Sequence, residues 1–132
     1  MDNRYRILIL DDDENICSFL RIFFEEEGCE VMTSLSAEEG LKKALEQRPD
    51  IVFVDLSIPE MGGIEVLRKL KKNNSNMAVV MITGFGTIEG AMKAMECGAH
   101  DYLTKPIDMD FMKEVVSCAL NSAQIKAAGI RY

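Results

Sequence analysis

Polar residues able to do chemistry follow four short apolar segments of this sequence. They are Asp11-Asp12-Asp13, Asp55, Thr83 and Lys105. Carboxylates that lie together repel one another unless a cation joins them. Ligand sets made only of oxygen suit a hard ion, so we expect Mg²⁺ at this place, with Mn²⁺ or Ca²⁺ as the next candidates.

A metal-bound carboxylate beside a lysine and a threonine suits phosphoryl transfer. Lys105 and the metal would offset charge on the phosphoryl oxygens, and Thr83 would donate a hydrogen bond to one of them. Asp55 stands alone at the end of its segment, so we predict that it attacks phosphorus and becomes phosphorylated. Singly, each residue could be an ordinary loop or capping residue, as we expect for Asp13, but their joint placement favours a site.

Apolar segments that alternate with amphipathic ones supply the scaffold for these residues. Segments of strand type occupy 5–10, 30–33, 51–54, 78–82 and 102–103. Helical spacing follows them. The apolar helix faces are expected at Ile16, Phe19, Leu20 and Phe23; at Ile64, Leu67 and Leu70; at Ile88, Ala91, Met92 and Met95; and at Phe111, Met112, Val115, Val116 and Ala119.

The ends of the helices also carry recognisable signals. Ser36 followed by Glu39 predicts a capping box at the start of the second helix, and Asp108 predicts a cap for the last one. Gly28 and Gly98 follow helical segments and are typical of residues that end a helix.

Alternating strands and helices predict an α/β fold, namely a doubly wound, five-stranded parallel sheet of the flavodoxin-like type with five helices. The wholly apolar first, third and fourth strands should be central, which gives the strand order 2-1-3-4-5. All carboxyl ends then share one edge of the sheet, where the four polar groups should meet. A length of 132 residues suits one domain. We expect it at 1–120, with 121–132 as a C-terminal helix extension or linker.

The motifs at these positions resemble the receiver domain of bacterial two-component response regulators, over about residues 4 to 120. The acidic pair after the first strand is matched by Asp11-Asp12, and the phosphoacceptor segment by the nine residues 55–63, DLSIPEMGG. A Thr-Gly pair is matched by Thr83-Gly84. The family's last run is matched by Gly98-Ala99, Asp101-Tyr102 and Lys105-Pro106. Gly62 stands where many members carry Asp.

The resemblance implies a role for each matched residue. Asp12 and Asp55 would coordinate Mg²⁺ directly, together with the backbone carbonyl of Ser57, and Asp11 would assist through water. Tyr102 would be the aromatic residue of the switch, rotating inward as Thr83 meets the phosphoryl group. Lys105-Pro106 resembles the family's cis peptide.

The resemblance also implies the function and the partners. A receiver takes a phosphoryl group from a sensor histidine kinase, or from a small phosphodonor, onto the residue matched by Asp55. The surface of helix four, strand five and helix five then controls an output domain or forms a phosphorylation-dependent homodimer. Such a domain is a signalling switch rather than an enzyme. The stretch 83–106 most resembles receivers of ATPase-type transcriptional activators, so we expect a transcriptional output.

Composition excludes several other classes of protein. The net charge is −7, with no cluster of Lys and Arg, so nucleic acid and membranes are poor partners. No signal peptide or apolar run of membrane-spanning length is present in the sequence. Cys17, Cys29, Cys97 and Cys118 show no disulfide or zinc spacing, and we interpret them as small buried hydrophobes. We expect a cytoplasmic location.

Three other interpretations use the same residues. Asp11-x-Asp13-x-Asn15 resembles the nucleophile motif of haloacid-dehalogenase-type phosphatases, but those enzymes are usually larger and would leave Asp55 without a role. The same run begins like a calcium loop, yet Ile16 takes the glycine position and no Glu closes the loop. Gly84-x-Gly86-x-x-x-Gly90 hints at dinucleotide binding, but its spacing and its place after the fourth strand are wrong.

Overall fold

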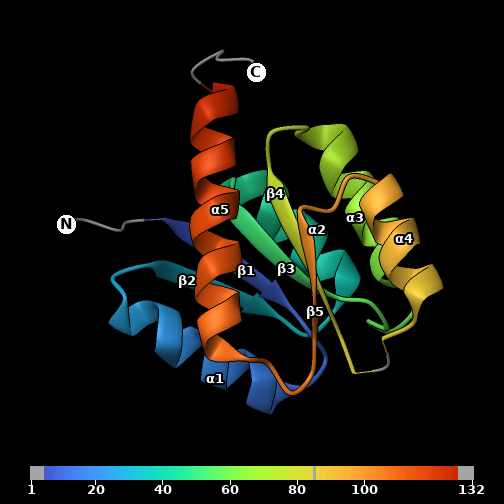
Figure 1. Ribbon diagram of the computed structural model, residues 1–132, viewed down its shortest axis with the longest axis horizontal. Coiled ribbons are helices and arrows are strands. Elements are labelled where there is room, and N and C mark those ends of the chain that lie inside the picture. Colours follow the sequence, from blue (N-terminus) through green and yellow to red (C-terminus); the bar gives the residue numbers. More distant parts are fainter. Residues whose placement is uncertain (1–4, 85, 128–132) are drawn as a thin grey trace.

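Five parallel strands and five helices alternate along the chain in a computed structural model that describes residues 5–84 and 86–127 (Figure 1). The strand order is β2-β1-β3-β4-β5, which confirms the predicted topology. The strands are β1 (Arg6–Leu10), β2 (Glu30–Ser34), β3 (Ile51–Asp55), β4 (Ala78–Thr83) and β5 (Asp101–Thr104).

The helices cover both faces of this sheet. In Figure 1 the long α5 crosses in front of the sheet, and α2 lies behind it. Helices α1 and α5 pack on one face, whereas α2, α3 and α4 pack on the other. The helices are α1 (Glu14–Glu26), α2 (Ala37–Gln47), α3 (Gly63–Asn73), α4 (Ile88–Glu96) and α5 (Met109–Ala127).

Two hydrophobic cores result, and the strands divide their residues between them by the two-residue period of β-structure. In β3, Ile51 and Phe53 point into the core under α1 and α5, while Val52 and Val54 point into the opposite core. All four side chains are fully buried. A strand that is apolar on both faces belongs inside a sheet, which is why β3 is central.

The predicted N-caps are present, but the capping box is only half formed, because the backbone N–H of Ser36 donates to Oγ of Ser34 and not to Glu39. The side chains of Asp13 and Ser36 accept hydrogen bonds from the backbone N–H groups of Asn15 and Glu39. Asp108 accepts from Asp110 and Phe111 at the start of α5. Gly28 and Gly98 follow α1 and α4 at φ of +89° and +100°, a region that favours glycine.

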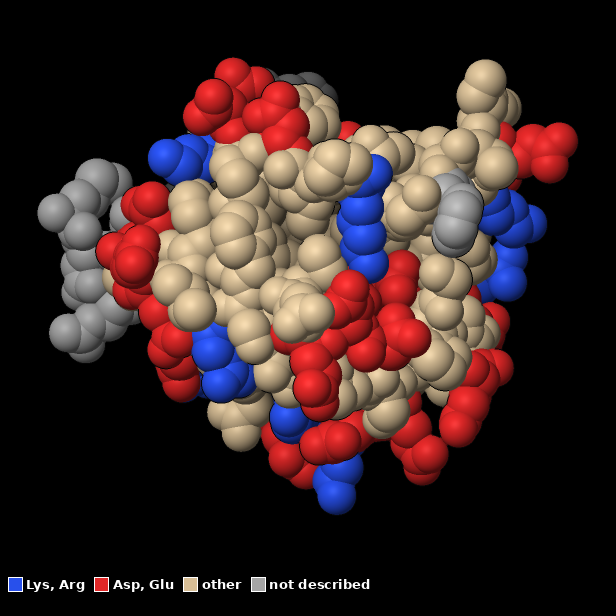
Figure 2. Space-filling view, turned by 90° about the horizontal axis from the view of Figure 1, so that it is seen from below, with Lys and Arg blue, Asp and Glu red and all other residues tan. Residues whose placement is uncertain are grey.

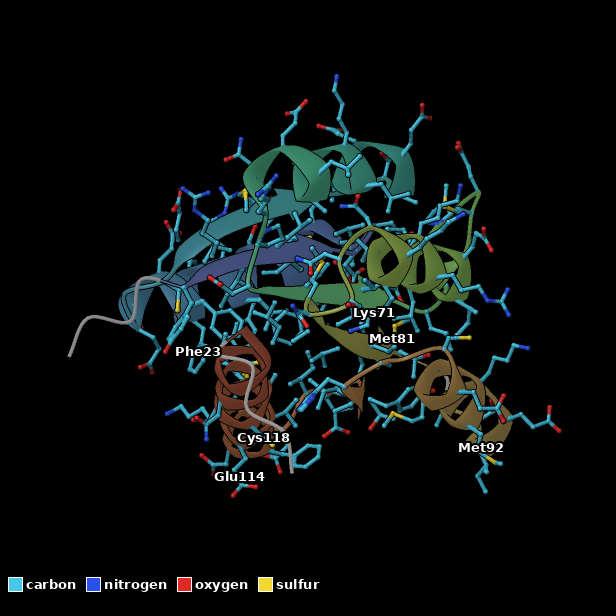
Figure 3. All side chains as sticks on the ribbon, turned by 90° about the horizontal axis from the view of Figure 1, so that it is seen from above. Phe23, Lys71, Met81, Met92, Glu114 and Cys118 are labelled. Carbon is cyan, nitrogen blue, oxygen red and sulfur yellow. The ribbon has the colours of Figure 1, made fainter. Side chains whose placement is uncertain are left out.

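The prediction for the apolar face of α4 was wrong in an informative way. Ile88, Met92 and Met95 are 81%, 59% and 49% exposed, and Ala94 is the residue of this helix that is fully buried. Figure 3 shows Met92 pointing away from the rest of the domain. The helix therefore touches the sheet through small residues and keeps its large apolar side chains outside. Phe111 of α5, expected on the inner side, is also exposed at 45%.

The buried stripe of α1 is shifted from the predicted one. Cys17, Leu20 and Phe24 are the buried residues, so only Leu20 of the predicted set is fully inside, and Phe19 is exposed. Phe24 stacks on Phe53 of β3 with ring centroids 5.5 Å apart, and it meets Phe23 edge-on at 5.2 Å. These ring contacts help to fix the rotation of the helix.

The peptide bond between Lys105 and Pro106 is cis, as the resemblance implies. The last helix continues to Ala127, and the rest of the expected 121–132 extension lies outside the described residues. Within the described part of the chain, no helix is long and apolar enough to cross a membrane.

The cysteines differ in their environment more than predicted, and this gives a testable consequence. Cys17 is buried, and burial together with the nearby Asp11 carboxylate raises the pKa of its thiol to about 11. Cys118 is exposed, which corrects its interpretation as a buried hydrophobe. At pH 7.5, iodoacetamide should therefore alkylate Cys118 and spare Cys17 until urea unfolds the protein. Peptide mass spectrometry measures both, and equal labelling in the folded protein would contradict the placement of Cys17.

Candidate functional site

The acidic site begins with two strands that end side by side. Leu10 of β1 pairs in register with Val54 of β3, so Asp11 and Asp55 follow at neighbouring positions. By the two-residue period, each continues the row of side chains that faces α1 and α5. Asp12, one residue later than Asp11, is exposed instead. The sheet thus delivers two buried carboxylates and one exposed carboxylate to its carboxyl edge.

These three carboxylates form a compact cluster. One carboxylate oxygen from each of Asp11, Asp12 and Asp55 lies within 4.8 Å of the others. Asp11 and Asp55 are 0% and 3% exposed. Figure 2 looks onto this end of the molecule, where acidic side chains gather near the centre with a basic side chain beside them. The cluster therefore concentrates negative charge at the carboxyl edge of the sheet.

Lys105, in the loop that follows β5, partly neutralises this charge. The Nζ atom of Lys105 lies 2.9 Å from Oδ2 of Asp11, and the backbone N–H of Asp13 donates to Oδ1 of Asp11 at 2.9 Å. Burial alone would lower the pKa of Lys105, but its hydrogen bond to Asp11 and the nearby carboxylate of Asp55 raise that pKa above its usual value. Lys105 is therefore charged at neutral pH and fixed at the rim of the site.

Asp55 is buried without such a close cation. Burial is the main cause that raises the pKa of Asp55, the carboxylate of Asp11 adds to it, and Lys105 opposes both. The backbone N–H and the hydroxyl of Ser57 contact Oδ1 of Asp55 at 3.3 and 3.4 Å. These contacts lie at the long end of hydrogen-bond distances, so they restrain the carboxylate only weakly.

Thr83 and Tyr102 lie where the neighbouring strands bring them. Thr83 is one residue beyond Ile82, the register partner of Asp55, and it is buried at 2% exposure. Its backbone carbonyl accepts from the N–H of Lys105 at 2.8 Å. Tyr102 pairs with Met81 and lies two residues further from the edge, with a buried hydroxyl. Thr83 therefore borders the acidic cluster, while Tyr102 lies behind it, under α4.

A separate groove of about 810 Å³ lies between α1 and α5, at the opposite end of the sheet. Phe23, Glu114 and Cys118, which are labelled in Figure 3, belong to its lining. Lys113 covers the Phe23 ring at 5.5 Å from the centroid. None of the predicted site residues lines this groove, so it plays no part in the acidic site.

The donor set of the acidic cluster fits a hard divalent cation. Its three candidate ligands are all carboxylates, and no imidazole or thiolate joins the cluster among the described residues. Such oxygen ligands suit Mg²⁺, Mn²⁺ or Ca²⁺ rather than zinc or copper. Asp13 has another role, because its side chain caps α1, and the calcium-loop and phosphatase interpretations both need it elsewhere.

The family is decided by a comparison over nearly the whole chain. The model for the response regulator receiver domain matches residues 7–117. The chain belongs to this family. It is thus a domain of a two-component signalling protein and not a conventional enzyme.

Known receivers resemble this one in sequence and in structure. The regulatory protein AtoC of Escherichia coli is 33% identical over 121 residues, which are 92% of this chain and 26% of AtoC. Sporulation initiation phosphotransferase F of Bacillus subtilis is 32% identical over 84% of this chain and 90% of its own length. A receiver domain structure from Clostridium thermocellum superposes with a TM-score of 0.87 at 33% identity, covering 92% of this chain and 98% of that one.

The likeness extends to a class of receiver. AtoC belongs to the ATPase-type activators, which confirms the predicted likeness to receivers of that class. The receiver spans between 26% and 51% of the length of the first curated relatives that it matches. Those relatives are transcriptional regulators that carry more than a receiver.

Sequence reasoning missed the pairing of Lys105 with Asp11 and the surroundings of the Tyr102 hydroxyl. The strand period did contain a signal for the first, because Asp11 continues the same row as Ile7 and Ile9. Nothing in the sequence pointed to the second, since it depends on how closely α4 approaches β5.

Proposed function

We propose that this receiver takes a phosphoryl group onto Asp55 and uses it to switch the surface formed by α4, β5 and α5. The observation that carries the proposal is the arrangement of the buried Asp55 in one compact cluster with the buried Asp11 and the exposed Asp12, beside Lys105. The phosphodonor is a sensor histidine kinase or a small molecule such as acetyl phosphate. The receiver unit is 1–120, and its place of action is the cytoplasm.

In the transfer step, an oxygen of Asp55 forms a new bond to phosphorus. The bond from phosphorus to the donor breaks, which is a P–N bond in phosphohistidine and a P–O bond in acetyl phosphate, and the donor leaves with the electron pair. Lys105 lies close enough to the cluster to offset charge on the phosphoryl oxygens, and the Thr83 hydroxyl donates to one of them. Asp55 keeps little solvent around it, which strengthens these interactions.

Asp11, Asp12, Asp55 and the backbone carbonyl of Ser57 are the groups that would hold Mg²⁺. When bound, the ion supplies positive charge that joins the carboxylates and balances the transferred phosphoryl group. Without it, the one cation within contact distance of the cluster among the described residues is Lys105, which is already paired with Asp11. The proposal therefore needs a divalent cation for transfer.

The expected result of removing that cation is loss of phosphorylation. Acetyl phosphate with Mg²⁺ should phosphorylate the wild-type chain, and an excess of EDTA should reduce the phosphorylated fraction to background. Intact mass spectrometry measures both samples through a shift of about 80 Da for one phosphoryl group. Equal phosphorylation in EDTA would show that the acidic cluster works without a metal, against the proposal. Addition of Mg²⁺ back to the chelated sample is the control for damage by EDTA.

The consequence of phosphorylation is proposed to reach α4 through Thr83. A phosphoryl group adds about −1.5 to −2 charge and new acceptor oxygens. Thr83 turns toward it, and the following loop and α4 move with Thr83. The exposed Ile88, Met92 and Met95 of α4 then present a different apolar surface to an output domain or to a second receiver.

A further inference from the structure

The hydroxyl of Tyr102 is buried and makes no hydrogen bond within the described part of the chain. Its ring packs against the core under α3 and α4. A buried hydroxyl without a partner costs about 1–3 kcal/mol. Native proteins keep few such groups, and each one calls for an explanation.

The space around this hydroxyl is bounded by two glycines. A β-carbon built on Gly86 would lie 3.7 Å from the Tyr102 hydroxyl oxygen, and one built on Gly90 would lie 3.9 Å from it. The β-carbon position of Gly86 would also lie 2.9 Å from Cγ2 of Thr104, and that of Gly90 would lie 3.3 Å from Cδ2 of Leu56. The phenol therefore ends in a narrow space that leaves little room for a side chain at either glycine position.

One side chain at the edge of this space presents an oxygen. The β-carbon position of Gly90 lies 3.0 Å from Oγ1 of Thr87, whereas Leu56 and Thr104 turn methyl carbons toward the space. Oγ1 of Thr87 already accepts from the N–H of Gly90 at 2.9 Å, as the N-cap of α4. A hydroxyl oxygen has two lone pairs, so it can accept a second hydrogen bond.

The first turn of α4 also has few buried contacts with the rest of the domain. Of the nine residues of this helix, Ala94 alone is fully buried, and it lies in the second half. Thr87, Ile88 and Glu89 at its start are exposed. A segment with few buried contacts has a low free energy of displacement. A shift of this turn toward Tyr102 therefore meets little resistance from the core.

We propose that Thr87 is the positioning residue of the switch: in the phosphorylated receiver, the Tyr102 hydroxyl donates a hydrogen bond to Oγ1 of Thr87. The inference rests on the proposed function, because the shift of α4 is driven from Asp55 through Thr83. In the resting state the hydroxyl is unpaired, and in the switched state it is satisfied. This difference favours the switched state and ties the cap of α4 to β5.

Beryllofluoride with Mg²⁺ stands in for the phosphoryl group and measures this difference. Its apparent dissociation constant is obtained by NMR titration of the Ser57 amide in four variants: Thr87→Val, Tyr102→Phe, the double variant and Thr87→Ser. The serine variant keeps both the cap and the acceptor oxygen, so it is the matched control. Loss of the cap in Thr87→Val affects resting and switched states alike and cancels in the dissociation constant.

Thr87→Val and Tyr102→Phe should each weaken beryllofluoride binding about fivefold, which is about 1 kcal/mol at 1.4 kcal/mol per factor of ten. The double variant should also lose about fivefold, because both changes remove the same bond. Thr87→Ser should bind within about twofold of wild type. Wild-type binding by Thr87→Val, or a loss of about 25-fold in the double variant, would overturn the inference. If the wild type itself failed to bind beryllofluoride, the proposed function would fall, and the inference with it.

Discussion

Asp55→Asn is expected to abolish phosphorylation by acetyl phosphate. The amide has no charged oxygen to attack phosphorus, and no neighbouring carboxylate can take its place. Asp11 is held by Lys105 at 2.9 Å, and Asp12 is exposed and one residue removed from the buried row. The mass shift of about 80 Da that one phosphoryl group adds to the wild type should be missing in this variant.

The matched control is Asp110→Asn in the first turn of α5. Asp110 is an exposed acidic residue outside the cluster, so this variant should be phosphorylated as fully as the wild type. A folded Asp55→Asn chain is expected, because the change removes one of three mutually repelling carboxylates. Full phosphorylation of the folded Asp55→Asn variant would move the phosphoacceptor to another residue.

Mg²⁺ is expected to stabilise the receiver against unfolding. A ligand that binds only the native state stabilises it by RT ln(1 + [L]/Kd), so about 10 mM Mg²⁺ at a site with a Kd of about 0.3 mM adds about 2 kcal/mol. Asp12→Ala should lose most of this gain while changing the free energy of unfolding little in EDTA, because Asp12 is exposed. Urea unfolding with Mg²⁺ and with EDTA measures both quantities.

Asp110→Ala serves as the control for a general effect of charge. It removes the same negative charge from the surface, so a response to Mg²⁺ equal to that of the wild type is expected. If Asp12→Ala responded like Asp110→Ala, the ion would be bound elsewhere or only by the diffuse charge of the domain.

The order of the strands and the place of the site could be predicted because both depend on short-range signals. Apolar segments that end at Asp11, Asp55 and Thr83 identify strand ends, and parallel strands bring their ends to one edge. The caps at Ser36 and Asp108 are local in the same sense, since each acts on backbone groups two or three residues away.

The depth at which side chains lie could not be read from periodicity. Ile88, Met92 and Met95 have the spacing of a buried helix face, yet α4 turns this face outward. A period of 3.6 residues shows that a helix has an apolar side, but the side that meets the sheet depends on which residues allow close approach. In α4 the small Ala94 does so, and the large residues stay exposed.

Contacts between segments far apart in the sequence could not be predicted either. The ion pair of Lys105 with Asp11 and the position of the Tyr102 hydroxyl depend on distances of a few ångströms between separate loops. The resemblance implied that Tyr102 would rotate inward on phosphorylation, but its hydroxyl is already buried in this structure. In the proposed switch, phosphorylation therefore changes the hydrogen-bond partner of the Tyr102 hydroxyl rather than its burial.

The most direct test of the account is to locate the phosphoryl group in the wild-type chain. After treatment with acetyl phosphate and Mg²⁺, reduction with borohydride converts a phosphorylated aspartate to homoserine, and peptide mass spectrometry then finds the altered residue. The account predicts homoserine at position 55 and nowhere else. Homoserine at Asp11 or Asp12, or a phosphate that resists reduction on Ser57 or Thr83, would contradict it.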